Sequence, residues 1–299
     1  MKRAYLALIA TLWTFSALAV ENSARSSAQS AFTPVIGAWR VQVEGDTRLR
    51  EFSAYRLRPA VADTFPLDAS YGWSDGNPDI VDASSILKDG KLQLKITTPA
   101  SSVIQAEQVD SNTFRGTFTG RSGNSKTVHM SRIILDLTNI DRPFADEDKD
   151  YGIAPTKSLT TNYHHNTPLS VPGATTIKTL ALKKLTDSTP SPLVIDVLGG
   201  TPGKRLTIPS AVWLGADAGD GRVYTAEKER FANVLSKLTN SDKSKTVVFF
   251  CLSADCWLSY NASLRAIEEG YKNVYWYRGG WMAWKAATLP FIKAEQFSW

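Results

Sequence analysis

The sequence predicts two domains of different class: an all-β antiparallel barrel or sandwich, followed by an α/β domain with a doubly wound parallel sheet. Strict alternation of apolar and polar residues in segments 91–97, 114–118 and 128–132 predicts the first. The second follows from strands that alternate with helices after Pro172, including the nearly continuous apolar run 192–198, typical of a parallel strand covered on both faces. A chain of 299 residues with 43% apolar content can bury two cores.

The N-terminus is typical of a secretory signal. Lys2 and Arg3 precede the apolar run 4–19, which ends in the small-x-small sequence Ala17-Leu18-Ala19. We therefore predict a signal peptide over residues 1–19, a periplasmic location and no membrane span after its removal; the alternative is an uncleaved N-terminal anchor. The polar residues 20–33 are predicted to form a disordered leader.

The charge distribution gives no reason to expect a nucleic-acid partner. Thirty-four Lys and Arg against 29 Asp and Glu give a formal charge of +5, which falls to +3 without Lys2 and Arg3. The basic residues are scattered and form no block.

Residues 34–135 form the predicted β domain, a meander whose hairpin turns fall at Asp89-Gly90, Ser111-Asn112 and residues 122–124. Gly37-Ala38-Trp39 at its start resembles the Gly-x-Trp opening of lipocalin-like barrels. Five aromatic residues either fill the core, which we favour, or line a ligand cavity: Trp39, Phe52, Tyr55, Tyr71 and Trp73.

Residues 136–171 are predicted to be a linker, because they are charged and interrupted by proline. His164 and His165 within it are candidate metal ligands, because imidazole pairs bind zinc or copper. No Cys, Asp or Glu lies close by in sequence to complete a site, so a solvated pair is favoured. We predict no metal site and no cofactor.

The α/β domain, residues 172–299, is expected to contain a short strand over 206–214. Before it, a short helix is expected from the helical spacing of the apolar residues Ile177, Leu180, Ala181 and Leu185. A helix capped by Thr225 should follow, with a strand ending at Cys251, a helix over 258–270 and a strand over 274–277.

Cys251 is the predicted centre of the chemistry. It ends an apolar strand and precedes a helix N-terminus, where backbone N–H groups and the helix dipole lower the pKa of a thiol and bind anions. Cys256 is the second of the two cysteines in the chain. In an oxidising compartment the pair either forms a disulfide or stays reduced.

Several segments resemble the rhodanese family. They are Cys251 with its short loop and helix, residues 270–284 with the turn Gly279-Gly280-Trp281, and Leu289-Pro290, together with residues 194–197 and 208–211. The resemblance covers about residues 172 to 292. It implies a thiosulfate sulfurtransferase-like activity in which Cys251 carries a sulfane sulfur as a persulfide, taken from a small sulfur donor and passed to a thiol acceptor.

The same resemblance implies that the loop residues cradle the persulfide anion through their N–H groups. These substrate-binding residues are Leu252, Ser253, Ala254, Asp255 and Trp257. Asp196 and Arg278 are candidate supporting residues, with a surface arginine as the alternative for Arg278.

Three departures from the family are visible. Cys256 stands where relatives carry arginine or glycine, and Asp255 adds a charge that opposes anion binding. Leu198 stands where relatives often carry arginine. This leucine would leave Asp196 without its usual arginine neighbour. These departures argue against thiosulfate as the natural donor.

Cys256-Trp257 and the segment 258–277 resemble the exported rhodanese-like group described as PQQ-dependent-catabolism-associated CXXCW-motif proteins. That resemblance implies a periplasmic role beside a quinoprotein alcohol-oxidising system. Sulfur transfer is the function we favour. A thiol–disulfide redox protein that uses Cys251 and Cys256, and a non-catalytic binding module, are the alternatives.

Overall fold

The computed structural model describes residues 32–74, 78–142, 144–222 and 225–299. The chain divides into two compact units, Met1–Arg132 and Ile133–Trp299. The predicted signal peptide and most of the leader, residues 1–31, lie outside the described residues. Within the described residues, no helix combines the length and the apolar character needed to cross a bilayer.

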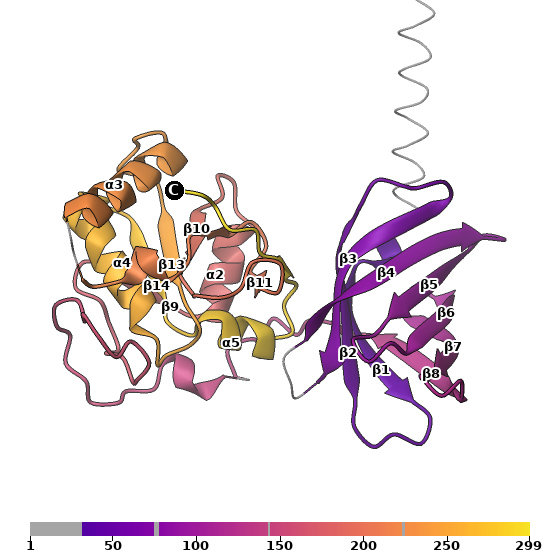
Figure 1. The fold of residues 1–299 in the computed structure, drawn as a ribbon. Coiled ribbons are helices and arrows are strands. Elements are labelled where there is room, and N and C mark those ends of the chain that lie inside the picture. The colour runs from indigo at the N-terminus through magenta and orange to yellow at the C-terminus, as the bar shows by residue number, and fades with distance from the viewer. Residues whose placement is uncertain (1–31, 75–77, 143, 223–224) are drawn as a thin grey trace, which may run out of the picture. The chain divides into compact units, whose positions relative to one another are not determined.

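The first unit is a closed barrel of eight antiparallel strands in sequence order (Figure 1), as the alternating pattern predicts. The hairpin-connected meander closes because β1 pairs with both β2 and β8. The strands are β1 Gly37–Val43, β2 Arg50–Leu57, β3 Thr64–Trp73, β4 Asp79–Lys88, β5 Lys91–Thr97, β6 Val103–Asp110, β7 Thr113–Thr119 and β8 Ser125–Arg132, preceded by the 3₁₀ turn η1 Thr33–Val35.

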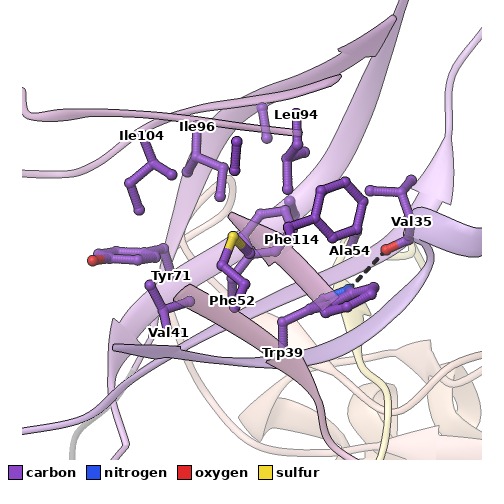
Figure 2. Close-up of a cluster of buried hydrophobic side chains, with 14 of the residues drawn as sticks. Val35, Trp39, Val41, Phe52, Ala54, Tyr71, Leu94, Ile96, Ile104 and Phe114 are labelled. Atoms are coloured by element: carbon purple, nitrogen blue, oxygen red, sulfur yellow. Dashed lines mark hydrogen bonds between the residues drawn. The ribbon is translucent and has the colours of Figure 1, made fainter. Parts of the chain in front are cut away.

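Apolar side chains that alternate along the strands fill the barrel interior. Trp39 is fully buried, donates from Nε1 to the Val35 carbonyl at 2.9 Å, and meets the Phe114 ring edge-on (Figure 2). Phe52 and Tyr71 are also buried, as the core interpretation predicts. Tyr55 is half-buried and Trp73 is 38% exposed, so the core interpretation is wrong for Trp73, which lies at the end of β3.

The second unit contains a five-stranded parallel sheet in the order β12-β10-β13-β14-β9, with helices on both faces (Figure 1). The doubly wound α/β prediction is therefore confirmed. Its elements are η2 Ala145–Glu147, β9 Thr175–Ile177, α2 Thr179–Thr186, β10 Leu193–Asp196, β11 Leu206–Thr207, β12 Val212–Trp213, η3 Ala216–Gly219, α3 Thr225–Thr239, β13 Val247–Phe250, α4 Trp257–Glu268, β14 Val274–Tyr277, α5 Gly280–Ala286 and β15 Ile292–Lys293.

Two element predictions in this unit are wrong. Ile177 ends strand β9 and the helix begins only at Thr179. The expected strand over 206–214 is two strands in different sheets, because a turn closed by the Ala211 N–H and the Ile208 carbonyl separates them. Ser210 in this turn has φ 67°, a left-handed conformation that no strand accommodates.

The predicted linker, residues 136–171, groups with the second unit. It contributes a 3₁₀ turn, η2, and several segments that pack against the parallel sheet and α4.

Candidate functional site

Cys251 follows directly after β13, a central strand whose four residues are all buried and paired on both sides with β10 and β14. Six residues later α4 begins at Trp257. The Sγ atoms of Cys251 and Cys256 form a disulfide whose Cα atoms are 6.2 Å apart. Cys251 is 1% exposed and Cys256 is fully buried, so this bond lies beneath the loop surface.

The Gly-Gly-Trp turn holds the start of the loop. The Trp281 and Met282 N–H groups donate to the carbonyls of Cys251 and Leu252, both at 2.9 Å. Gly280 has φ 60°, and a Cβ there would lie 2.5 Å from the Cys251 oxygen. Only glycine allows this close approach, which explains the Gly279-Gly280 pair in the sequence.

One predicted cradle donor, Trp257, and the adjacent Cys256 already have hydrogen-bond partners for their N–H groups. The Cys256 N–H donates to the Ser253 carbonyl at 3.1 Å, and the Trp257 N–H donates to the Tyr163 carbonyl at 2.8 Å. Within the described part of the chain, the N–H groups of the four residues from Leu252 to Asp255 have no partner. These four groups, from Leu252, Ser253, Ala254 and Asp255, remain available to an anion.

A segment of the predicted linker runs along this loop, and we call residues 163–167 the strap. His164 and Cys256 form an antiparallel bridge. The Ala254 carbonyl accepts from the Thr167 N–H at 3.0 Å and from the Thr167 hydroxyl at 2.6 Å. Trp257 Nε1 donates to Nδ1 of His165 at 3.0 Å. The strap therefore covers the disulfide-bearing end of the loop.

Sequence reasoning missed the strap as part of the site. It lies about ninety residues before the loop, as the separation of 87 between Thr167 and Ala254 shows, and its residues have no periodic pattern. His164 and His165 are both exposed, as predicted, but His165 also binds Trp257. Among the described residues, no three His, Cys, Asp or Glu side chains gather where they could hold a metal ion.

Arg278 is buried, at 1% exposure, so the surface interpretation is wrong. Its guanidinium donates to the Lys149 carbonyl at 2.8 Å and, at 3.1 Å each, to the Thr167 carbonyl and hydroxyl. It reaches the loop only through Thr167 of the strap. Burial lowers the pKa of Arg278. Its function in this site is to fasten the strap and the η2 segment to β14.

Asp196 has an arginine neighbour, contrary to the expectation from Leu198. Arg205 Nη2 and the Thr207 hydroxyl each donate to its Oδ2 at 2.6 Å, and the Leu198 N–H donates to Oδ1 at 2.9 Å. Burial raises the pKa of the Asp196 carboxyl, whereas Arg205 and Thr207 oppose that rise. Arg205 comes nine residues after Asp196 in the chain, and its guanidinium balances the negative charge of the Asp196 carboxylate.

Asp255 is exposed and accepts a hydrogen bond from the Ser253 hydroxyl. No ion pair to Asp255 is formed within the described residues. Its negative charge therefore stands uncompensated on the loop, as the sequence suggests.

Glu147 is a second residue that sequence reasoning missed. It is 2% exposed, accepts a hydrogen bond at Oε1 from the Thr179 hydroxyl at 2.7 Å, and leaves Oε2 without a partner among the described residues. The Thr179 hydroxyl also contacts the Tyr277 hydroxyl at 2.7 Å. Burial raises the pKa of Glu147 to about 7. A Cβ on Gly279 would lie 2.7 Å from Oε1, so this carboxyl packs under the Gly-Gly turn.

The second unit is an α/β domain in which a cysteine directly follows a central parallel strand. A short loop then leads from this cysteine to a helix N-terminus. Residues 179–287 match the rhodanese-like domain family. The chain therefore carries a rhodanese-like domain, preceded by a β-barrel unit. No curated protein matches the chain.

Several solved structures are similar to parts of the chain. A redesigned β-barrel is 23% identical over 35% of this chain and 96% of its own, with a TM-score of 0.27. The 30 kDa polysulfide-sulfur transferase homodimer from Wolinella succinogenes is 21% identical over 40% of this chain and 80% of its own, with a TM-score of 0.27. An EanB variant in complex with ergothioneine covalently linked with a persulfide is 17% identical over 41% and 32%, with a TM-score of 0.33.

The disulfide limits what the loop can do as it stands. Both sulfur atoms are bonded to each other, so neither can attack a sulfur donor until a reductant cleaves the bond. Cys251 shares its loop with the four unpaired N–H groups and lies six residues before the start of α4.

Proposed function

We propose that this protein is an exported sulfurtransferase that carries a sulfane sulfur as a persulfide on Cys251. The observation that carries the proposal is the placement of Cys251 at the end of β13, beside four unpaired loop N–H groups and within bonding distance of Cys256. The unpaired donors suit a persulfide anion, which has no counter-cation in this loop.

In the loading step the Cys251 thiolate attacks the outer sulfur of an organic persulfide. The new Cys251 S–S bond forms as the donor's S–S bond breaks, and the donor leaves as a thiolate that keeps the electron pair. Asp255 and the replacement of a cation by Cys256 disfavour dianionic thiosulfate, so a thiol-bound sulfane sulfur is the donor class that suits this loop.

The loaded sulfur has two ways to leave. An external thiolate attacks the outer sulfur, takes it as a new persulfide and restores the Cys251 thiolate. Alternatively, the Cys256 thiolate attacks Sγ of Cys251, forms the Cys251–Cys256 disulfide and expels hydrosulfide. In that second route the two cysteines are oxidised and the sulfane sulfur is reduced, and an external dithiol must then reduce the disulfide before the next turnover.

The Cα separation of 6.2 Å supports Cys256 as the resolving residue. Disulfides join cysteines whose Cα atoms lie about 4.4–6.8 Å apart, so the folded loop accommodates the bond that the resolving step forms.

The test compares loading in reduced wild type, Cys251→Ser and Cys256→Ser. Each is freed of reductant, incubated with glutathione persulfide or thiosulfate, and measured by intact mass. Cys256→Ser should gain and keep one sulfur atom, and Cys251→Ser should gain none. Equal sulfur loading on Cys251→Ser would overturn the proposal.

The disulfide itself favours a second candidate function, a thiol–disulfide redox protein in which Cys251 and Cys256 exchange electrons with partner thiols. The same mass measurement separates the two. Wild type and Cys256→Ser that never gain sulfur, together with disulfide exchange with a dithiol, support the redox protein.

Export and the quinoprotein connection are further parts of the proposal. The N-terminal sequence 1–19 and a disulfide, which persists in an oxidising compartment, support the periplasm. The Cys256-Trp257 pair supports a role beside a quinoprotein alcohol-oxidising system. Fractionation of the producing cell, and quinoprotein alcohol dehydrogenase activity with and without the protein, test these two statements. Cytosolic protein, or unchanged activity, contradicts the corresponding one.

A further inference from the structure

One end of the barrel contains two buried hydrogen-bond donors without partners. Arg50 begins β2 and Tyr71 lies near the end of β3; in the strand register Arg50 opposes Trp73, and Phe52 opposes Tyr71. Arg50 and Tyr71 line a cavity of about 220 Å³ together with Trp73, Asp79 and Phe118. This cavity, which we call the mouth cavity, lies at the barrel end where β1 and β3 end and β2 and β4 begin.

Neither donor is satisfied within the described residues. Tyr71 is 5% exposed and its hydroxyl has no partner. Figure 2 shows this hydroxyl pointing away from the apolar side chains of the core. The Arg50 side chain is 11% exposed; Nη2 binds Asp46 at 2.5 Å, but Nη1 has no partner. Buried polar groups in folded proteins are almost always hydrogen-bonded, so two adjacent exceptions on one cavity indicate a missing acceptor.

The unpaired Nη1 of Arg50 favours an anionic acceptor. The guanidinium groups of Arg48 and Arg50 lie 4.3 and 4.2 Å from the Trp73 ring centroid, and Lys126 binds Asp46 at 3.1 Å. Carboxylates at this end of the barrel are Asp46, Glu44 near Lys126, and the exposed Asp79 on the cavity wall. Burial raises the pKa of Tyr71 to about 12, so its hydroxyl keeps the proton and can donate.

The walls of the cavity favour a flat apolar body. Phe118 and Trp73 present aromatic rings, and Arg50 lies 5.5 Å from the Phe118 centroid. Deeper in the barrel, side chains such as Ile96 and Ile104 fill the interior, so a ligand is confined to the mouth. A phosphate group suits this site poorly, because aromatic surface forms much of the wall.

We propose that the mouth cavity binds a small aromatic carboxylate, whose carboxylate accepts hydrogen bonds from the Tyr71 hydroxyl and from Nη1 of Arg50 while its ring packs against Phe118 and Trp73. This site belongs to the barrel unit and is independent of the sulfur chemistry proposed for Cys251.

Ligand-observed fluorine NMR on the full chain tests the proposal with para-fluorobenzoate as the probe and para-fluorobenzamide as its neutral counterpart. The benzoate should bind saturably and the benzamide more weakly. Tyr71→Phe keeps the ring and removes one donor, so it should weaken benzoate binding about tenfold or more. Arg50→Gln should weaken it further because the positive charge is also lost.

Arg115→Gln removes a charge from an exposed position on β7 and is the matched control, with binding unchanged. Circular dichroism of each variant confirms that the barrel is folded, and Tyr71→Phe, which changes a single oxygen, carries the conclusion if Arg50→Gln unfolds. No saturable benzoate binding, equal binding of the benzamide, or unchanged binding in folded Tyr71→Phe overturns the proposal.

Discussion

Replacing Arg278 with methionine should release the strap from β14. The side chain keeps its length and apolar stem but loses every donor. Thr167 then loses its two bonds to the guanidinium, and the carbonyls of the η2 segment lose theirs. Because Thr167 donates a hydrogen bond from its hydroxyl to the Ala254 carbonyl, the contact between the strap and the loop should weaken as well.

The size of the effect follows from the geometry. Three of the Arg278 contacts lie within 3.1 Å, and hydrogen bonds to charged groups contribute about 1.5–3 kcal/mol each. Removing a buried charge also removes its desolvation penalty, which offsets part of that loss. We expect the free energy of unfolding of the second unit to fall by about 3 kcal/mol.

Two measurements check this. Chemical denaturation reports the loss of stability, and the rate at which a water-soluble phosphine reduces the Cys251–Cys256 disulfide reports opening of the strap. Because local opening governs access to a buried bond, the rate should rise about tenfold or more. Lys228→Met, at an exposed position on α3, is the control and should change neither. A lower free energy of unfolding without faster disulfide reduction would refute the role of the strap as a cover. If neither the free energy of unfolding nor the reduction rate changes, the anchoring role of Arg278 is refuted.

Three other changes have definite expected outcomes. Glu147 has a folded pKa of about 7 against an ordinary 4.5, so between these pH values unfolding releases a proton, and the free energy of unfolding falls by about 3 kcal/mol as pH rises from 4.5 to 7. Glu147→Gln keeps the hydrogen bond from Thr179 and should flatten this part of the curve of unfolding free energy against pH. An unchanged slope would assign the pH dependence to another group. Ser210→Gly should stabilise the second unit by about 1 kcal/mol in denaturation, because glycine adopts φ 67° without strain, whereas a loss of stability would mean that the serine side chain matters. Reducing the Cys251–Cys256 disulfide, which closes a separation of five residues, should lower the unfolding free energy by about 2 kcal/mol, and equal stability of the two redox forms would contradict this loop-closure argument.

The sequence predicts well what local periodicity encodes. Alternation along β5, with Leu92, Leu94 and Ile96 facing inward, is enough to predict a half-buried antiparallel strand. The apolar run before Cys251 and the helix after it predict the strand, loop and helix that present the cysteine. In both cases a short stretch of chain contains the whole signal.

Sequence reasoning fails where the partner lies far away and has no pattern of its own. Arg278 binds backbone carbonyls about 130 residues earlier, and carbonyls are present at every position, so no residue type marks them. Arg205 takes the place of the expected neighbour of Asp196, and it comes from a turn and not from position 198, just after β10. Glu147 looks like one of several acidic linker residues until packing buries it beneath the Gly-Gly turn.

Single-turnover release of hydrosulfide is the sharpest test of sulfur transfer through Cys251. Fully reduced wild type, stripped of reductant, is mixed with one equivalent of glutathione persulfide, and hydrosulfide and disulfide are measured in the same sample. Hydrosulfide should appear in step with the Cys251–Cys256 disulfide, whereas Cys256→Ser should hold the sulfur on Cys251 and release none. Sulfide release that proceeds equally in Cys251→Ser, or a disulfide that forms without sulfur ever reaching Cys251, would contradict sulfur transfer through Cys251.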